Sequence, residues 1–393
     1  MKKKSHPILP GSTLGILGGG QLGRMMAMAA RTLGYHVRTL DPDASCASRF
    51  VVDKLVTASF EDADAAAELA RGCDVVTLEI EKVSQASLKA AAKLAPVRPS
   101  ATVLEIIQDR IKQKTWLDKH GFPVGPFSVA RTANQLAGAA LRMRAPAYVK
   151  AARGGYDGRG QFYLTAPEMA GAAWTELGGF APRRSGPLAC VVERALSIDA
   201  EVSILVARSP SGETAVYPPS LNHHEDRILE HCVLPAPISP KIAKRATEIA
   251  RAIAEAIEVI GLLVVEFFIT TDGKLLVNEL APRPHNTFHG TEVGCLTSQF
   301  EQAVRAVCDL PLGSTEPVRS VAVYNLLGEL WLSSDASPRG SPAFDRALAL
   351  PGVRVHLYGK REARPGRKMG HLSAAAKTPK DAVALVKKAR ALL

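Results

Sequence analysis

Short apolar runs alternate with segments of helical composition over the first hundred residues. The apolar runs lie at 13–17, 35–40 and 74–80, and the helical segments lie at 24–33, 59–71 and 84–94. Strands that alternate with helices in this way are typical of a parallel sheet with helices on both faces. The pattern predicts a doubly wound α/β domain that ends near residue 100, with a further short strand at 97–99.

The pattern of apolar positions changes after residue 100. A long helical stretch at 100–120 can break near Asp109, and residues 148–206 alternate short strands with one helix at 167–177. This middle part of the chain therefore mixes helices and strands without the regular alternation of the first domain.

The last third of the chain begins with an amphipathic helix at 239–260. Two apolar strands at 262–269 and 274–280 follow and predict a hairpin around Thr271-Asp-Gly273. The remaining predicted elements are helices at 298–309 and 379–392 and strands at 320–327 and 353–357.

A glycine-rich turn joins the first predicted strand to the first helix. Gly18, Gly20 and Gly23 form a variant of G-x-G-x-x-G, and Asp41 follows the second strand. This arrangement is typical of dinucleotide-binding βαβ units. It also occurs wherever a helix packs tightly on a parallel sheet, and the helix N-terminus could equally hold the phosphate of a mononucleotide. The turn alone leaves these interpretations open.

A second glycine-rich run follows Lys150. Four glycines between Gly154 and Gly160 form a flexible hairpin loop, whose backbone N–H groups can approach an anion. The lysine before the loop supplies a point charge that suits phosphate. The alternative is a surface hairpin without a ligand.

The predicted hairpin at 262–280 carries carboxylates inside apolar strands. Glu266 lies on its first strand, and Asn278 and Glu279 lie on its second. A buried carboxylate is costly unless it is paired or binds a metal. Carboxylates combined with phosphate oxygens are the ligands that Mg²⁺ prefers. The sequence favours a magnesium site here over the alternative, in which each glutamate pairs with an arginine.

Three further polar segments are candidates for a functional site. Arg110 and Lys114 lie one helical turn apart on one face, and the loop at 282–289 is rich in arginine, histidine and asparagine. A basic turn at 360–368 could clamp a phosphate. Solvated surface is the alternative for the helix face and for the basic turn.

Composition narrows the class of protein. The net charge is +11, but the basic residues are mostly dispersed and aromatic residues make up 5%, so a nucleic-acid-binding surface is not expected. The six cysteines show no close C-x-x-C pair, which supports neither a zinc site nor a disulfide scaffold. No run approaches the ~20 apolar residues of a membrane span. We expect a cytoplasmic protein that acts away from membranes.

Four motifs occur in the order found in one enzyme family. They are Gly18-Gly-Gly-Gln-Leu-Gly-Arg24, Gly154-Gly-Tyr-Asp-Gly-Arg-Gly-Gln161, Asn278-Glu-Leu-Ala-Pro-Arg-Pro-His-Asn286 and Arg364-Pro-Gly-Arg-Lys-Met-Gly-His371. With them the chain resembles the N5-carboxyaminoimidazole ribonucleotide synthases, ATP-grasp ligases of purine biosynthesis, from about Thr13 to His371.

The resemblance implies three domains in a homodimer. These are a preATP-grasp domain over 1–103, an ATP-grasp domain over 104–312 with a lid at about 145–205, and a small β-rich C-terminal domain over 313–393. The implied reaction joins bicarbonate to the amine of 5-aminoimidazole ribonucleotide at the expense of ATP. Carboxyphosphate forms first, and it, or CO₂ released from it, is captured by the amine.

The resemblance also implies roles for individual residues. The implied ATP contacts are Arg110, Lys150, Gly155, Tyr156, Asp157, Gly158, Arg159, Gly160, Gln161, Glu193, Arg194, Ala195, Leu196, Glu201, His224, Asn278 and Glu279. The end of the strand at Glu193 would meet the adenine, and Glu201 would suit the ribose hydroxyls. Mg²⁺ would lie on Glu266 and Glu279. The residues implied at the ribonucleotide and the reacting groups are Gln21, Tyr156, Asp157, Arg159, Arg283, His285, Asn286, Lys360 and Arg367, of which Lys360 and Arg367 would hold the 5′-phosphate.

Three positions depart from the family pattern. Phe288 stands in place of a glycine, Lys82 in place of an asparagine, and Arg227 in place of another glycine. We expect these changes to add bulk and charge near the substrates. They leave open an alternative function, in which the protein is another ATP-grasp carboxylate–amine ligase that acts on a different anionic substrate. A non-catalytic nucleotide-binding module is a third hypothesis, which the carboxylates and lysines of the motifs disfavour.

Overall fold

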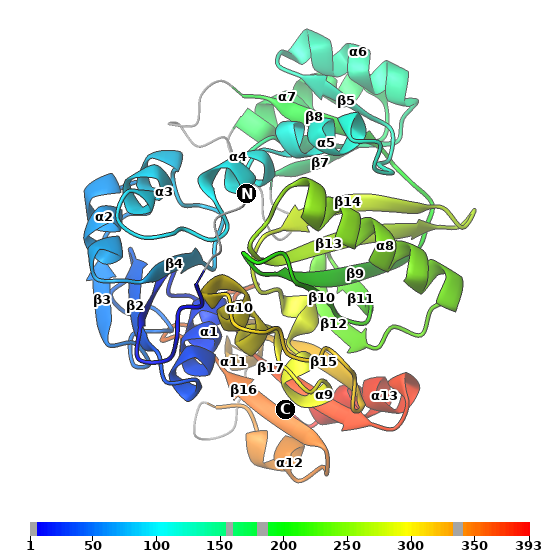
Figure 1. Cartoon of the computed structure of the whole chain (residues 1–393). Helices are drawn as coiled ribbons and strands as arrows, with labels where there is room; N and C mark the ends of the chain where they lie inside the picture. Colours follow the sequence, from blue (N-terminus) through cyan, green and yellow to red (C-terminus); the bar gives the residue numbers. More distant parts are fainter. Residues whose placement is uncertain (1–5, 155–159, 179–187, 333–340) are drawn as a thin grey trace.

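The computed structural model describes residues 6–154, 160–178, 188–332 and 341–393, in which the strands form three sheets (Figure 1). The first sheet is parallel, with the strand order β3-β2-β1-β4. Its elements are β1 (Thr13–Leu17), α1 (Gln21–Thr32), β2 (His36–Asp41), β3 (Lys54–Thr57), α2 (Ala63–Arg71), β4 (Val75–Leu78) and α3 (Gln85–Ala92). Helix α1 packs on one face of this sheet, and α2 and α3 pack on the other. The predicted doubly wound domain is confirmed.

Two details of this sheet differ from the prediction. Strand β3 was not expected, because its four residues are half exposed and lack an apolar run. The strand predicted at 97–99 is wrong, since Val97 makes only an isolated bridge to Val76.

The helical stretch after residue 100 does break at Asp109. It forms α4 (Ala101–Ile107) and α5 (Arg110–Lys119). The Asp109 carboxylate caps α5 by accepting hydrogen bonds from the N–H groups of Ile111 and Lys112. This cap fixes the start of α5 and therefore the position of Arg110.

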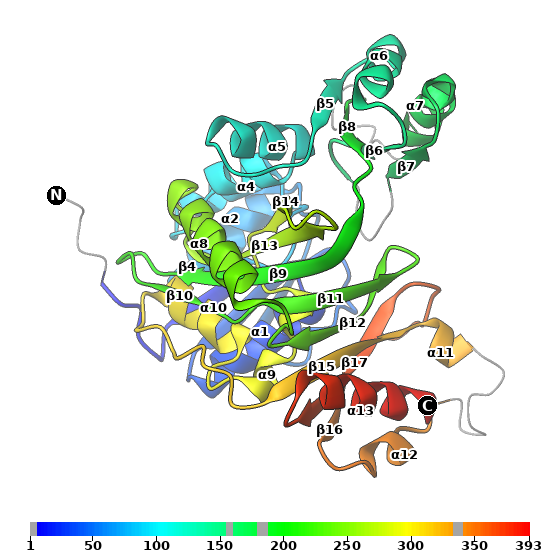
Figure 2. The same cartoon turned by 90° about the vertical axis from the view of Figure 1, so that its right-hand side faces the viewer.

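A second, four-stranded sheet forms a small separate unit with the strand order β5-β8-β6-β7. Its elements are β5 (Phe127–Ala130), α6 (Ala133–Met143), β6 (Ala147–Ala151), β7 (Gln161–Leu164), α7 (Ala170–Gly178) and β8 (Cys190–Arg194). Helices α6 and α7 bury their apolar faces against the sheet. Figure 2 shows this unit projecting from the rest of the molecule, with β8 leading into β9 of the large sheet.

The third sheet has nine strands in the order β14-β13-β9-β11-β12-β15-β17-β16, with β10 paired to β9. Its strands are β9 (Ile198–Arg208), β10 (Thr214–Val216), β11 (Ser220–Glu225), β12 (Ile228–Leu234), β13 (Gly261–Thr270), β14 (Leu275–Ala281), β15 (Ser320–Leu327), β16 (Val353–Leu357) and β17 (Lys368–Ala376). The helices associated with it are α8 (Pro240–Ala256), α9 (Thr291–Gly294), α10 (Gln299–Cys308), α11 (Glu329–Leu332), α12 (Phe344–Leu348) and α13 (Pro379–Ala391).

This large sheet runs without interruption across the predicted boundary at residue 313. Strand β12 pairs with β15 from His231–Tyr324 to Leu234–Val321. Strand β17, between β15 and β16, was not predicted. Its sequence Lys368-Met-Gly-His-Leu-Ser-Ala-Ala-Ala376 lacks β-branched residues, so propensity gives no strand signal. Among the described residues, no helix is both long and apolar enough to cross a membrane.

The turn between β11 and β12 adopts a conformation that favours glycine. Asp226 and Arg227 form the two-residue loop between the paired Glu225 and Ile228, and their φ angles are 48° and 68°. Two-residue hairpin turns with both φ angles positive prefer Asn-Gly or Asp-Gly. Arg227, which replaces the glycine of the family pattern, therefore carries local backbone strain.

We predict that Arg227→Gly raises the free energy of unfolding by about 0.5–1 kcal/mol. A residue with a Cβ in the left-handed region costs about 1–2 kcal/mol, and glycine removes this cost. The higher conformational entropy of glycine in the unfolded chain offsets part of the gain. Urea denaturation measures the change. Arg227→Ala removes the exposed side chain but keeps the Cβ, so it is the matched control and should leave stability nearly unchanged. Equal effects of the two substitutions would contradict the strain argument.

Candidate active site

The first glycine-rich turn is filled by carboxylates of its own domain. Glu79, at the end of β4, accepts hydrogen bonds from the N–H groups of Gly20 and Gly23, both at 2.9 Å. Asp41 accepts one from the N–H of Gly19 at 2.7 Å. Burial raises the pKa of Glu79 to about 7. A phosphate at this helix N-terminus would have to displace these carboxylates, so the hydrogen bonds of the turn do not favour a phosphate there.

The hairpin of β13 and β14 places its two glutamates directly opposite one another. Glu266 and Glu279 are register partners on the paired strands. An Arg110 Nη donates to Glu279 Oε2 at 2.9 Å. Glu266 instead lies beside His285, with Nε2 3.5 Å from Oε1, and beside the Asn278 amide at 3.4 Å. The arginine pairing considered as the alternative is therefore present for Glu279, while Glu266 meets a histidine and an amide.

The two glutamates of this pair titrate in opposite directions. Burial, reinforced by the charge of Glu279, raises the pKa of Glu266 to about 7. Desolvation would also raise the pKa of Glu279, but the charge of Arg110 and its hydrogen bond outweigh it and lower that pKa. The ligand-free hairpin thus holds one ionised carboxylate and a second that resists ionisation.

The same hairpin has the donor set expected of a magnesium site. Asn278 Oδ1 is buried and has no hydrogen-bond partner among the described residues. This orphaned oxygen lies on the strand of Glu279, and the nitrogen of the same amide lies 3.4 Å from Glu266 Oε2. Three oxygen donors, two of which repel one another, match the preference of Mg²⁺ for hard oxygen ligands. The residues present therefore fit the metal.

Basic side chains converge on Glu193, at the end of β8. Lys150 Nζ donates to Glu193 Oε2 at 2.8 Å, and Lys114 Nζ lies 3.7 Å from Oε1. Burial would raise the pKa of Glu193, but the charges of Lys150, Lys114 and Arg110 outweigh it and lower the pKa to about 2. The Glu193 carboxylate thus faces the lysines.

The burial of Lys114 contradicts the alternative of a solvated helix face. Lys114 is only 2% exposed, and its ammonium also donates a hydrogen bond to the Val277 carbonyl at 3.3 Å. Burial lowers the pKa of Lys114 to about 8. The sequence made Lys114 a candidate through its helical spacing from Arg110, but it gave Lys114 no specific contact, because an ordinary surface pair has the same spacing.

The residues after Glu193 connect the small sheet to the large one. Arg194 Nε donates to the Met143 carbonyl at 3.0 Å, and the Ala195 N–H donates to the Pro146 carbonyl at 3.0 Å. Leu196 packs beside Gly125. Beyond this link, His224 Nδ1 on β11 lies 2.9 Å from the Glu201 carboxylate on β9. Burial would lower the pKa of His224, but Glu201 raises it.

The polar loop after β14 faces both neighbouring domains. Arg283 Nε lies 2.7 Å from Glu81 Oε1, which follows β4 of the first sheet. His285 Nδ1 contacts the Thr287 hydroxyl at 2.8 Å, and the Asn286 amide oxygen contacts His289 Nε2 at 3.1 Å. Burial holds the pKa of His285 well below its usual value, so the imidazole is neutral at pH 7. The sequence did not predict that Glu81 pairs with Arg283, because the two residues are about 200 positions apart.

The basic turn approaches the first domain as well. Lys360 Nζ donates to the Lys368 carbonyl at 2.7 Å, and an Arg367 Nη donates to the Glu362 carbonyl at 2.8 Å. Asp43 follows β2, and hydrogen bonds from Ser45 lower its pKa. The charge of Arg367 adds to this lowering. Gln21 begins α1 in the same domain and is half-buried. Their proximity to a shared substrate stays a prediction.

Part of the predicted lid lies outside the described residues. This applies to Gly155, Tyr156, Asp157, Gly158 and Arg159. The ends of the loop are described: the Gly160 carbonyl accepts a hydrogen bond from the Ala151 N–H at 2.8 Å. Gln161 opens β7 in register with Lys150, so the loop is anchored beside the basic cluster.

Comparison with known proteins matches all three parts of the chain to family models. The ribonucleotide synthetase preATP-grasp domain matches residues 12–108, the ATP-grasp domain matches 115–300, and the phosphoribosylaminoimidazole carboxylase C-terminal domain matches 321–384. The N5-carboxyaminoimidazole ribonucleotide synthase of Bacillus subtilis is 38% identical over 93% of this chain and 92% of its own. That of Brucella melitensis is 39% identical over 93% and 96%.

The chain belongs to the N5-carboxyaminoimidazole ribonucleotide synthase family. Solved structures of the family share its fold. An ADP complex of such a synthetase superposes with a TM-score of 0.90 at 37% identity, covering 98% of both chains. The synthase of Aspergillus clavatus in complex with ADP and 5-aminoimidazole ribonucleotide has a TM-score of 0.86 at 31% identity, covering 97% and 98%.

Of the three departures from the family pattern, Phe288 does not crowd the candidate site as expected. Phe288 is fully buried in the core, where its ring meets Tyr217 edge-on at 6.2 Å. Arg227 lies in the exposed turn of β11 and β12. Lys82 is exposed beside Glu81. The expectation that Phe288 adds bulk next to the substrate is wrong, because its side chain turns into the core.

The burial of Glu266, reinforced by the charge of Glu279, predicts a pH-dependent effect of Glu266→Gln. The folded-state pKa of Glu266 is raised from 4.5 to about 7, so ionising it destabilises the fold increasingly as the pH rises through this window. In EDTA, Glu266→Gln should gain stability relative to wild type between pH 5 and pH 8, by at most about 3 kcal/mol. Urea denaturation at the two pH values measures the difference.

The control for this experiment is Glu255→Gln, on the exposed side of α8. It makes the same chemical change away from any carboxylate pair. If Glu266→Gln gained no more stability than the control between the two pH values, the raised pKa of Glu266 would be refuted.

Proposed function

We propose that the protein carboxylates 5-aminoimidazole ribonucleotide with bicarbonate, forming N5-carboxyaminoimidazole ribonucleotide while ATP becomes ADP and phosphate. Membership of the family, over almost the whole chain, carries this proposal. The arrangement of charges supports it: Arg110, Lys114 and Lys150 lie around Glu193 and Glu279 on adjoining elements. A basic cluster facing oxygen donors is suited to a triphosphate and its metal.

The chemistry divides into two transfers. A bicarbonate oxygen attacks the γ-phosphorus of ATP, the bond to the β–γ bridging oxygen breaks, and ADP leaves with that oxygen. The amine of the ribonucleotide then attacks the carbon of carboxyphosphate, or of CO₂ released from it, phosphate leaves, and the nitrogen loses a proton as the carbamate forms. Neither step needs a covalent bond to the protein, so catalysis rests on positioning and charge neutralisation.

The nucleotide would lie between the small and large sheets. Arg110 and Lys150 would neutralise its phosphates together with the backbone of the loop that ends at Gly160 and Gln161. The segment from Glu193 to Leu196 would border the adenine, and Glu201 with His224 would meet the ribose. Mg²⁺, held by Glu266, Glu279 and Asn278, would supply positive charge against the phosphate oxygens.

The second substrate would lie on the side of the first domain. Lys360 and Arg367 would bind its 5′-phosphate, with Gln21 close to it and Tyr156, Asp157 and Arg159 above. Arg283 is held by Glu81 and would stabilise negative charge on carboxyphosphate. His285 is neutral and can accept a hydrogen bond from the amine, and Asn286 would help to position it. We also infer a cytoplasmic homodimer.

Release of ADP tests the function. The purified protein with ATP, Mg²⁺ and bicarbonate should release ADP rapidly only when 5-aminoimidazole ribonucleotide is added, with carbamate formed in equal amount. ADP release that depends on another amine would identify a different ATP-grasp ligase, and none under any condition would leave a nucleotide-binding module. Both outcomes would overturn the proposal.

Lys114→Met should raise the KM for ATP about tenfold, which corresponds to roughly 1.4 kcal/mol. In the wild type, Lys114 and Lys150 share the single negative charge of Glu193, so the group of three keeps one positive charge for the phosphates. Without Lys114, the charges of Lys150 and Glu193 cancel one another. The KM for the ribonucleotide should stay nearly constant.

Lys112→Met is the matched control for this substitution, because Lys112 lies on the same helix but pairs with Glu105 at the surface. It should change neither KM, and Lys114→Arg should restore most of the ATP affinity. An unchanged KM for ATP in Lys114→Met would remove Lys114 from this role.

A further inference from the structure

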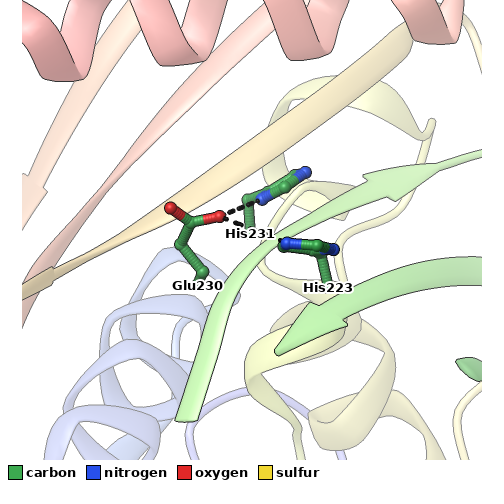
Figure 3. A group of neighbouring side chains, drawn as sticks. All are labelled: His223, Glu230 and His231. Carbon is green, nitrogen blue, oxygen red and sulfur yellow. Dashed lines mark hydrogen bonds and ion pairs between the residues drawn. The ribbon is translucent and has the colours of Figure 1, made fainter. Parts of the chain in front are cut away.

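A cluster outside the candidate active site brings together two histidines and a carboxylate. His223 on β11 and His231 on β12 are register partners, and their rings lie 4.7 Å apart at an angle of 39°. Glu230 Oε2 lies 2.8 Å from His231 Nδ1 and 3.8 Å from His223 Nε2. Figure 3 shows the Glu230 carboxylate turned toward both imidazoles. We propose that His223, Glu230 and His231 form a binding site for a divalent transition metal such as Zn²⁺.

A β-bulge creates this cluster. Neighbouring residues of a regular strand point to opposite faces, so Glu230 and His231 would normally diverge. The register passes from His223–His231 to His224–Leu229, which leaves Glu230 as an extra residue in β12. Such bulges redirect side chains, and here the bulge lets Glu230 meet both histidines.

The three side chains need little movement to hold an ion. A tetrahedral ion at about 2.0–2.2 Å from each donor separates the donors by about 3.3 Å. All three donor atoms already lie within 4.8 Å of one another. Opening the 2.8 Å contact and closing the 3.8 Å one by about half an ångström each would bring both to that separation, and the distance between the two imidazole nitrogens, which is within 4.8 Å, would have to adjust as well. His223 has a side chain that is 60% exposed, so water can complete the coordination.

The protonation states and the second layer of contacts also suit a metal. Burial opposes ionisation of Glu230, but hydrogen bonds from the Tyr324 hydroxyl and from His231 outweigh it and lower its pKa. Burial lowers the pKa of His231. A carboxylate and a neutral imidazole are the forms that coordinate metals. Tyr324 on β15 donates to Glu230 Oε1, which orients the carboxylate with Oε2 toward the histidines, as outer-shell partners do in metal sites.

Lys387 on α13 works against the ion. Its positive charge acts on both Glu230 and His231, so it repels a divalent cation and limits the affinity. This repulsion provides a diagnostic substitution, since Lys387→Ala should tighten metal binding.

A second cluster in the described residues, Glu292 with His356 and His371, is less suited to a metal. The rings of His356 and His371 are nearly parallel, at 13°, so their in-plane lone pairs do not converge on one point. His371 Nδ1 is also engaged by the Tyr358 hydroxyl at 2.9 Å. It supplies a control for the first cluster.

Calorimetric titration of the untagged, EDTA-treated, nucleotide-free protein with Zn²⁺ tests the proposal. One equivalent should bind at a site that His223→Ala and Glu230→Gln each weaken at least tenfold and Lys387→Ala tightens. His36→Ala is the matched control, because His36 is also an exposed histidine (66%) beside a carboxylate, 3.7 Å from Asp53. It and His356→Ala should bind Zn²⁺ as wild type does.

Two results would overturn the site. One is Zn²⁺ binding by wild type that His223→Ala and Glu230→Gln leave unchanged, or no binding at all. The other is a Co²⁺ spectrum dominated by thiolate charge transfer, which would place the metal on cysteines. Circular dichroism of each variant checks that the protein is folded. A loss of Zn²⁺ binding then reflects the loss of the coordinating side chain.

Discussion

Two carboxylates on adjacent strands impose the constraint on which the candidate active site depends. Glu266 and Glu279 face one another on β13 and β14, in a sheet whose other positions are mostly apolar. Without compensation this pairing would destabilise the hairpin. Arg110 compensates one carboxylate, and the other stays reluctant to ionise. The two facing carboxylates therefore disfavour folding. A metal ion bound together with a triphosphate would relieve their repulsion.

The compensating charges come from elements far apart in sequence. Asp109 caps α5 and so directs Arg110 and Lys114 toward the hairpin, while β6 and β8 of the small sheet contribute Lys150 and Glu193. Because Lys150 and Glu193 belong to the unit that carries the glycine-rich loop, any movement of that unit changes the distance between the basic cluster and Glu279. In the proposed function, a closure of the small sheet over the large one would therefore also change how the phosphates are neutralised.

A single sheet of nine strands carries residues of both the nucleotide site and the C-terminal part. Strand β12 joins them by pairing with β15, so the basic turn before β17 is fixed relative to the hairpin of Glu266 and Glu279. The Arg283–Glu81 pair fixes the first domain to the same frame. Two of the departures from the family pattern fall outside this frame: Phe288 fills the core, and Arg227 strains an exposed turn.

The amino-acid sequence by itself determined the local structure and the types of residue available for chemistry. Periodicity identified the parallel domain, the break at Asp109 and the hairpin at 262–280, because these depend on interactions between near neighbours. It missed β3 and β17, whose strand character comes from pairing with distant strands. Motif order indicated the family and the carboxylates of the site.

Only the tertiary structure decided which charges meet. The Gly18–Gly23 turn reads as an anion site until Glu79, some sixty residues later, is seen to occupy its N–H groups. Lys114 reads as a surface residue until packing buries it against Glu193, and Phe288 reads as a substrate neighbour until its rotamer turns it into the core. In each case the deciding partner is far away in sequence. Burial and pairing are properties of the fold, and no local pattern of residues encodes them.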